Sequence, residues 1–233
     1  MATQLTWLGH GCWLIETEQG RAILDPFLDE SPVAPRKAEQ IEADYVLLSH
    51  GHFDHVADAA AIANRTGATV ISNFEITQWL SHNQGVRNVE PMNLGGSICV
   101  PFGRVKMTIA HHSSQLPDGS YGGNPAGFVL QLTDGNVYFA CDTSLFADMQ
   151  QIGAMGLEVA VLPIGDRYTM GPDDAVEAVR LLKPAHVLPA HYNTWPPIAQ
   201  DPQAWAARVQ AETKAQAAVL SPGESFTLRR AQN

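Results

Sequence analysis

The sequence is poor in cysteine. Its three cysteines, Cys12, Cys99 and Cys141, are far apart and odd in number, which argues against a disulfide framework. No C-x-x-C pair is present, so a thiolate zinc site is not expected either. Reduced thiols in a cytoplasmic protein are the simplest interpretation.

Long hydrophobic runs are also missing. No stretch approaches the roughly 18 consecutive apolar residues of a membrane helix, so the sequence predicts no membrane span. The N-terminus, MATQLTWLGHGCWLI, lacks the basic segment of a signal peptide, and its GHG interrupts the apolar residues. We therefore predict a cytoplasmic location.

Positive charge is scarce. The chain has 14 Lys and Arg against 24 Asp and Glu, which gives a formal net charge of −10. An acidic surface repels phosphate backbones, so nucleic acid is not expected as a partner. A small charged substrate is still allowed, because a bound metal can dominate the local field. The sequence leaves open whether the chain forms a homo-oligomer.

The length and hydrophobicity are those of a globular protein. With 233 residues, 45% of them hydrophobic, we expect one domain over residues 1–233. Strands come in a block and then interleave with helices, which favours a layered α/β domain. Asp134-Gly135, between two β-favouring runs, predicts a hairpin. The other segments used below are a strand at 45–49, helices at 56–66, 73–84, 144–156, 172–183 and 201–214, and a closing strand at 224–229.

The stretch SHGHFDH gathers four metal-ligand residue types, His50, His52, Asp54 and His55, between a predicted strand and a predicted helix. Ligands of α/β proteins usually bind at such strand ends. Imidazoles favour Zn, Fe, Ni or Cu, and an added carboxylate admits Mn. Four ligands so close together over-supply one tetrahedral ion, so the cluster predicts two metals and further ligands elsewhere. The alternative, a chance cluster on a solvated loop, is disfavoured by the rarity of H-x-H-x-D-H.

Other predicted strands also end in His or Asp. MTIAHHSS places His111 and His112 at one strand end, CDTS places Asp142 at another, and AHYNT places His191 at a third. A single strand-terminal Asp is commonly a cap for the following helix. Several such ends together are hard to explain as caps. Strand parity does not decide between His111 and His112.

At this point the sequence resembles the metallo-β-lactamase superfamily. SHGHFDH matches the H-x-H-x-D-H signature of that superfamily, and AILDPF, HHSS, CDTS and AHYNT follow in its order along the chain. Within the superfamily, GHG, GGNPAGF and TMGPDDA are similar to a group of metal-dependent hydrolases related to L-ascorbate-6-phosphate lactonase.

The resemblance implies an α/β fold, the four-layer αββα sandwich, with two divalent metal ions at one edge. Zn or Mn is expected, with Fe or Ni as alternatives. The first ion would be bound by His50, His52 and His112, and the second by Asp54, His55 and His191, with Asp142 bridging both. His112 is chosen over His111 because the ligand of the family directly precedes Ser-Ser.

The expected reaction is hydrolysis of a small ester, lactone or related molecule by a hydroxide that bridges the metals. Asp54 is the candidate catalytic residue, as a ligand that also orients the nucleophile or takes its proton. Asp25 is expected to fix ligand orientation from behind the site. His10 and Asn193 are further candidates. His10 either points into the cleft or is a satisfied histidine of a Gly-flanked turn, and Asn193 and Thr194 are expected to hydrogen-bond around His191. The alternatives are a phosphodiesterase or nuclease, an iron-dependent oxidoreductase of the same fold, and a metal-binding domain without activity.

Overall fold

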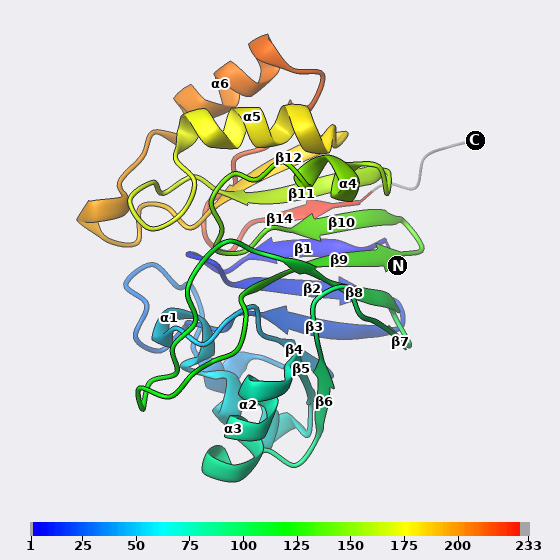
Figure 1. Ribbon diagram of the computed structural model, residues 1–233, viewed down its shortest axis with the longest axis vertical. Coiled ribbons are helices and arrows are strands. Elements are labelled where there is room, and N and C mark those ends of the chain that lie inside the picture. Colours follow the sequence, from blue (N-terminus) through cyan, green and yellow to red (C-terminus); the bar gives the residue numbers. More distant parts are fainter. Residues whose placement is uncertain (1, 229–233) are drawn as a thin grey trace.

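Two seven-stranded sheets pack face to face in the computed structural model, which describes residues 2–228, and helices cover both outer faces (Figure 1). The expected four-layer α/β sandwich is confirmed. In spatial order the first sheet is β14 (Ser225–Thr227), β1 (Gln4–Trp7), β2 (Trp13–Thr17), β3 (Gly20–Leu24), β4 (Tyr45–Leu47), β5 (Thr69–Asn73) and β6 (Val89–Met92). The second is β13 (Gln216–Ala217), β12 (His186–Ala190), β11 (Leu157–Pro163), β10 (Gly135–Phe139), β9 (Ala126–Leu132), β8 (Gly103–Ile109) and β7 (Ser97–Val100).

The helices fall into two groups, one for each sheet (Figure 1). On the first sheet lie α1 (Phe53–Val56), α2 (Ala59–Thr66) and α3 (Phe74–Gln84); on the second lie α4 (Met149–Gly153), α5 (Pro172–Leu182) and α6 (Pro202–Glu212). Two short 3₁₀ turns, η1 (Ala38–Gln40) and η2 (Pro196–Ile198), lie in loops. None of the helices within residues 2–228 has the length and apolar character that crossing a membrane requires.

Strand β4 has apolar residues in succession, without alternation of apolar and polar residues, because both of its faces are buried. Val46 packs in the core under α2 and α3, whereas Leu47 packs in the core between the sheets. Because both faces are covered, both positions must be apolar. The strand is shorter than expected, ending at Leu47 rather than at residue 49, and the chain then enters the loop of His50.

Several helix boundaries differ from those expected. The expected helix 56–66 is divided into α1, which already begins at Phe53, and α2. Asp58 lies between the two helices, where its side chain accepts a 2.6 Å hydrogen bond from the Leu28 backbone N–H. The segment 144–156 is helical only over Met149–Gly153. The segment 201–214 forms Pro202–Glu212, with Asp201 capping its N-terminus.

Other expectations are confirmed with small shifts. Helix α5 begins with Pro172 and carries Asp173 and Asp174 in its first turn, and it ends one residue before residue 183. Helix α3 fits the expected 73–84, with Asn73 as its cap. The β9–β10 hairpin turns at residues 133–134, and Gly135 is the first residue of β10. Of the closing segment 224–229, residues 225–227 form β14 and Arg229 lies outside the described residues.

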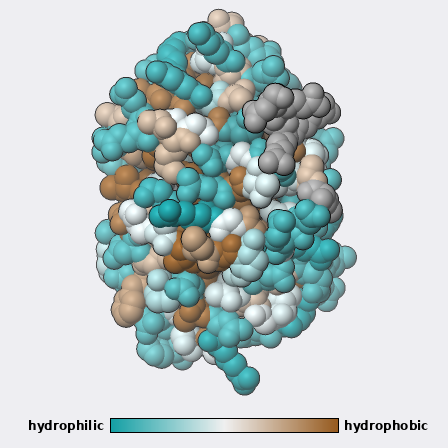
Figure 2. All heavy atoms as spheres, turned by 90° about the vertical axis from the view of Figure 1, so that its right-hand side faces the viewer, coloured by the Kyte–Doolittle hydropathy of each residue, from teal (hydrophilic) through white to brown (hydrophobic). Residues whose placement is uncertain are grey.

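Strand directions bring the ends of many strands to one edge. Strands β3 to β6 are parallel to one another, as are β10 to β13. The parallel strands of each sheet therefore deliver the segments that follow them to a common edge. The opposite edge is seen in Figure 2, where hydrophilic side chains cover most of the surface and hydrophobic ones form separate small patches.

Candidate metal centre

The SHGHFDH segment turns directly from β4 into α1. His50 is buried in the loop, and His52 is the N-cap residue of α1, so Asp54 and His55 lie on the first helical turn. His50 Nε2 lies 2.9 Å from His52 Nδ1. The ring of His112, at the end of β8, lies 5.0 Å from each of these two rings. These three histidines form the first group, with ligand atoms within 4.8 Å of one another.

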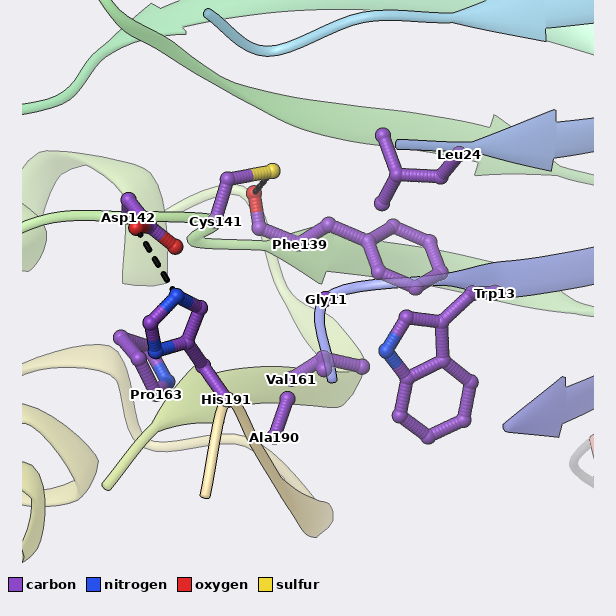
Figure 3. Close-up of a pocket in the computed structure, with 10 residues that line it drawn as sticks. All are labelled: Gly11, Trp13, Leu24, Phe139, Cys141, Asp142, Val161, Pro163, Ala190 and His191. Carbon is purple, nitrogen blue, oxygen red and sulfur yellow. Dashed lines mark hydrogen bonds and ion pairs between the residues drawn. The ribbon is translucent and has the colours of Figure 1, made fainter. Parts of the chain in front are cut away.

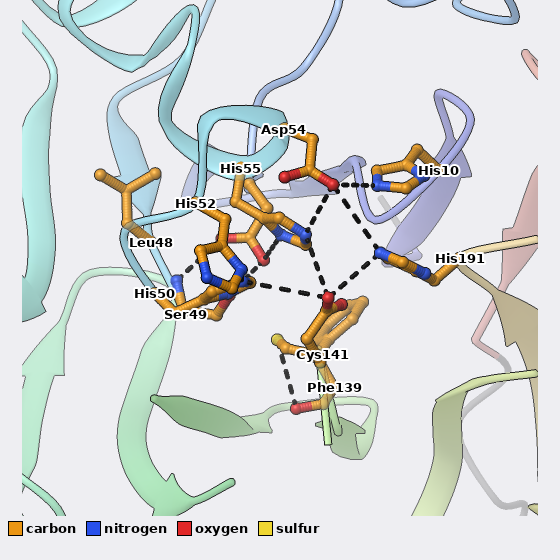
Figure 4. A network of polar contacts seen from close by, with 12 residues as sticks. His10, Leu48, Ser49, His50, His52, Asp54, His55, Phe139, Cys141 and His191 are labelled. Carbon is orange, nitrogen blue, oxygen red and sulfur yellow. Dashed lines mark hydrogen bonds and ion pairs between the residues drawn. The ribbon is translucent and has the colours of Figure 1, made fainter. Parts of the chain in front are cut away.

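A second group lies beside the first and joins Asp54 to three histidines (Figure 4). Asp54 Oδ2 lies 3.8 Å from His55 Nε2 and 4.0 Å from His191 Nε2. His10 Nε2 lies nearer, 2.9 Å from the same oxygen. The structure thus places His10 beside the three residues expected to bind the second ion.

Asp142, which follows β10, faces both groups through one oxygen. Its Oδ2 lies 3.1 Å from His191 Nε2 and 3.5 Å from His55 Nε2, both in the second group. The same oxygen lies 3.5 Å from His112 Nε2 and 3.9 Å from His50 Nε2, both in the first group. A single carboxylate oxygen thus lies between four imidazoles, two from each group.

The donor set fits divalent metal ions. Nε2 of His55 and Nε2 of His191 are buried and have no hydrogen-bond partner within residues 2–228. Buried polar atoms are normally partnered, and an imidazole lone pair facing a carboxylate is suited to a cation between them. Six nitrogen and oxygen donor side chains without cysteine, together with the shared carboxylate, match the preferences of Zn, Mn, Fe or Ni.

Asp25 contacts the cluster from behind, directly and through Ser49. It follows β3 with φ of 45° and is almost fully buried. One carboxylate oxygen accepts from the Ser49 backbone N–H at 2.8 Å. The other lies 2.9 Å from His55 Nδ1 and accepts from Ser49 Oγ at 2.5 Å. Because Ser49 Oγ is also 2.9 Å from His50 Nδ1, Asp25 orients one histidine of each group.

His10 is held in the cleft by a tight turn. The chain passes through Gly9 at φ 92° and His10 at φ 53° before β2 begins. His10 Nδ1 is 2.7 Å from Thr194 Oγ1, so its two ring nitrogens link Thr194 to Asp54. The sequence suggested that Asn193 and Thr194 hydrogen-bond around His191, and the structure corrects this for Asn193, which is exposed and whose side chain accepts from the Gln200 backbone N–H. Thr194, the next residue, is the one that contacts the cluster.

The two adjacent histidines after β8 point in different directions. His112 faces Asp142, whereas the exposed His111 stacks its ring on Phe146 at 4.8 Å and an interplanar angle of 3°. The structure therefore brings His112 into the cluster and leaves His111 outside it, as the family pattern implied.

The charge states of the two groups differ. Burial and neighbouring histidines lower the pKa of His50, and burial lowers the pKa values of His52 and His112. Burial also acts to lower the pKa of His55, but the carboxylates of Asp142, Asp25 and Asp54 outweigh it and raise that pKa well above its usual value. Opposing the effect of burial, the histidines hold the pKa values of Asp54 and Asp142 below their usual range.

A small cavity lies behind the cluster, between the sheets (Figure 3). Its volume is about 10 Å³, which is the space of a single water molecule. It is lined by Gly11, Trp13, Leu24, Phe139, Cys141, Asp142, Val161, Pro163, Ala190 and His191. The solvent-accessible side of the cluster is the outer edge, where His52 is half-buried and Phe53 is exposed.

The outer edge carries a feature that the sequence analysis missed. Phe27, Phe53 and Trp195 contact one another beside the second group, with ring centroids 5.8 to 6.1 Å apart. These residues belong to three segments that are far apart in the sequence. Only Phe53 lies within a motif that the sequence marks as part of the site, SHGHFDH. Asp166 and Arg167 have left-handed backbone conformations, and the Gly122 carbonyl accepts from Asn73 Nδ2 and Ser114 Oγ.

Comparison with known proteins agrees with this geometry. Residues 4–191 match the beta-lactamase superfamily domain. A UPF0173 metal-dependent hydrolase of Pelotomaculum thermopropionicum is 45% identical over 230 residues, covering 97% of this chain and 100% of the relative. A UPF0173 metal-dependent hydrolase of Thermus thermophilus is 44% identical over 225 residues, covering 97% of this chain and 99% of the relative.

Solved structures show the same fold. Igni18, a metallo hydrolase from Ignicoccus hospitalis, superposes with a TM-score of 0.87 at 35% identity, over 97% of this chain and 98% of that one. An isothiocyanate hydrolase from Delia radicum gut bacteria has a TM-score of 0.78 at 19% identity, over 97% of this chain and 99% of that one, and shares the fold. By its sequence and its fold, this chain belongs to the metallo-β-lactamase superfamily and, within it, to the UPF0173 metal-dependent hydrolase family.

Proposed function

We propose that this protein is a hydrolase that uses two divalent metal ions, Zn or Mn, to cleave a small ester, lactone or related molecule. His50, His52 and His112 would hold one ion, and Asp54, His55 and His191 the other, with Asp142 shared. The observation that carries this proposal is the position of Asp142 Oδ2, 3.1 to 3.9 Å from Nε2 atoms of both groups. Membership of a family of metal-dependent hydrolases supports it.

When bound, such ions lower the pKa of a coordinated water and polarise the group that is attacked. The side chains of the protein prepare the site for this chemistry. Asp25 and Ser49 fix His55 and His50 with their Nε2 atoms turned toward Asp142. Second contacts of this kind set the tautomer and orientation of a ligating histidine.

Asp54 is the residue that we assign to orienting the attacking water. Its low pKa keeps it ionised, and its side chain is 12% exposed, at the entrance of the site. One oxygen is engaged by His10. The other can accept a hydrogen bond from the attacking water and align it for attack.

The shape of the site supports a small substrate. The inner cavity has room for one water molecule only, so the reacting group must reach the histidines from the open edge. An acidic chain with a net charge of −10 disfavours a nucleic acid substrate. A lactone, as in the resemblance to L-ascorbate-6-phosphate lactonase, is a member of the proposed substrate class.

The test combines metal analysis with a substrate panel. Protein expressed with added Zn or Mn is expected to hold two ions per chain, and the Asp142→Asn variant fewer. The reconstituted protein is then assayed on a lactone, a thioester, an aryl ester and a phosphodiester, with oxygen uptake followed in parallel. Hydrolysis of a carboxylic ester or lactone that depends on Asp54 and Asp142 is the expected result. Faster cleavage of the phosphodiester, oxygen uptake with iron, or full activity in the double variant Asp54→Asn, Asp142→Asn would overturn the proposal.

A further inference from the structure

We propose that Phe53 and Trp195, supported from beneath by the buried Phe27, form the binding surface for an apolar alkyl or aryl substituent of the substrate. This inference rests on the proposed function, since it names the class of ester or lactone on which the site acts. We call these three residues the aromatic surface.

Phe53 occupies an unusual place for an exposed aromatic side chain. It lies between His52 and Asp54 in the motif, begins α1, and is 53% exposed. Single exposed hydrophobic residues are common and need no explanation. Phe53 is not isolated, however, because its ring meets Phe27 edge-on at 5.8 Å and Trp195 at 6.1 Å. It is the outer part of a continuous apolar surface.

The aromatic surface is continuous with the metal-ligand residues. The Trp195 ring lies 5.0 Å from the His10 ring, and the Phe27 ring lies 5.7 Å from it, both nearly edge-on. His10 in turn contacts Asp54 at 2.9 Å. A substituent attached near the reacting carbon would therefore meet these rings as soon as the carbon reached Asp54.

The surface has a fixed base. Phe27 is 1% exposed and rests in the protein interior. Trp195 is half-buried, and η2 directly after it is closed by the Ile198 N–H donating to the Trp195 carbonyl at 3.0 Å. The turn of His10 is joined to the end of β12 by a 3.0 Å hydrogen bond from the His191 N–H to the His10 carbonyl. Rigid aromatic rings bind apolar groups at a low cost in conformational entropy.

The first group of histidines has a polar border instead. Ser113 Oγ lies 3.3 Å from His52 Nε2, on the loop that follows His112. The site is thus apolar beside the second group and polar beside the first. This asymmetry predicts a substrate whose hydrolysable bond separates an apolar part from a polar one.

The chain offers a matched control for Phe53. Phe74 is 54% exposed and is likewise the first residue of a helix, α3. Among the described residues it makes no ring contact with Phe27, Trp195 or His10. Phe53→Ser and Phe74→Ser therefore remove equally exposed rings, of which only one belongs to the aromatic surface. Phe53→Leu keeps an apolar side chain at the same place.

The first measurement is hydrolysis of γ-butyrolactone and γ-nonalactone by the metal-loaded protein. The wild type is expected to prefer the alkylated lactone in kcat/KM. Phe53→Ser should reduce that preference about tenfold, an effect of the size that apolar pocket contacts produce, whereas Phe53→Leu and Phe74→Ser should retain it. An equal loss for both lactones in Phe53→Ser, or an unchanged preference, would overturn the inference.

The second measurement does not require catalysis. Calorimetry compares the binding of 4-phenylbutyrate, acetate and a quaternary ammonium carboxylate to the metal-loaded protein. The aromatic surface is supported if phenylbutyrate binds more tightly than acetate and Phe53→Ser removes this difference. If that result is obtained while no lactone is cleaved, only the proposed reaction fails. Equal binding of phenylbutyrate and acetate, or tightest binding of the ammonium compound, overturns the inference.

Discussion

The imidazole of His10 hydrogen-bonds to the carboxylate of Asp54, with Nε2 2.9 Å from Oδ2. Burial lowers the pKa of His10 to about 3, so His10 is neutral at ordinary pH. A neutral imidazole has one N–H, and Asp54 accepts it while Thr194 Oγ1 donates to Nδ1. His10 is therefore a positioning residue for Asp54.

Replacing His10 tests this relationship. His10→Leu leaves Asp54 without its donor and should weaken binding of the second metal equivalent by 10- to 100-fold, as loss of a supporting contact typically does. The first equivalent should bind as in the wild type. Metal titration monitored by calorimetry measures both, and His82→Leu, an exposed histidine on α3, is the control. Equal weakening of both equivalents would contradict the assignment.

The two groups should differ in proton release on metal binding. His50, His52 and His112 have lowered pKa values and are neutral at pH 7, whereas His55 has a raised pKa and carries a proton in the metal-free protein. A ligating histidine must be deprotonated. The first equivalent should thus release few protons and the second about one, and only the second affinity should fall steeply as pH decreases toward 6. Calorimetry in buffers of different ionisation enthalpy counts the protons; equal release in both steps would refute this prediction.

The neighbours His111 and His112 provide an internal comparison. Because His112 faces Asp142 and His111 stacks on Phe146, His112→Ala should remove the first metal and most activity, while His111→Ala should retain both. Loss of the stacked ring should cost about 1 kcal/mol of stability at most. Metal content after dialysis and a thermal melt separate the two variants, and loss of metal in His111→Ala would show the opposite assignment.

Gly11 is placed where a side chain would disturb a ligand. A Cβ at this position would lie 2.9 Å from Cε1 of His55. Gly11→Ala should therefore displace His55 and lower metal affinity, although the backbone there tolerates alanine. Gly67→Ala is the control, because a Cβ at this position would meet no other atom, but the backbone φ is 75°. It should lower the free energy of unfolding by about 1 kcal/mol and leave metal affinity unchanged. Urea unfolding and metal titration on both variants should show these opposite effects.

Local sequence patterns predicted the parts of the site that belong to one segment. His50, His52, Asp54 and His55 are adjacent in the chain, and the strands before Asp142 and His191 have clear β-favouring composition. Such local patterns do not predict which distant segments contact one another. Parity could not distinguish His111 from His112, because the chain leaves the regular strand at Ile109, before either of them.

The errors have the same physical origin. Helix 56–66 is divided because Asp58 bonds to the Leu28 backbone, thirty residues earlier in the chain. Asn193 and Thr194 were both expected near His191, but a left-handed backbone at residue 193 places the Asn193 side chain at the Gln200 backbone N–H instead. The aromatic surface combines residues 27, 53 and 195, which only the folded chain brings together.

The shared position of Asp142 has a mechanical consequence. Strand β4 of one sheet leads to His50 and His55, while β10 and β12 of the other lead to Asp142 and His191. Ions bound among them would cross-link the two layers at a single edge and close a long loop of the chain, which restricts the unfolded ensemble as a disulfide does. The metal-loaded protein should then open from the opposite edge, where the turn of the β7–β8 hairpin lies. Hydrogen exchange should show metal-dependent protection of β4 and β12 and little change in β7.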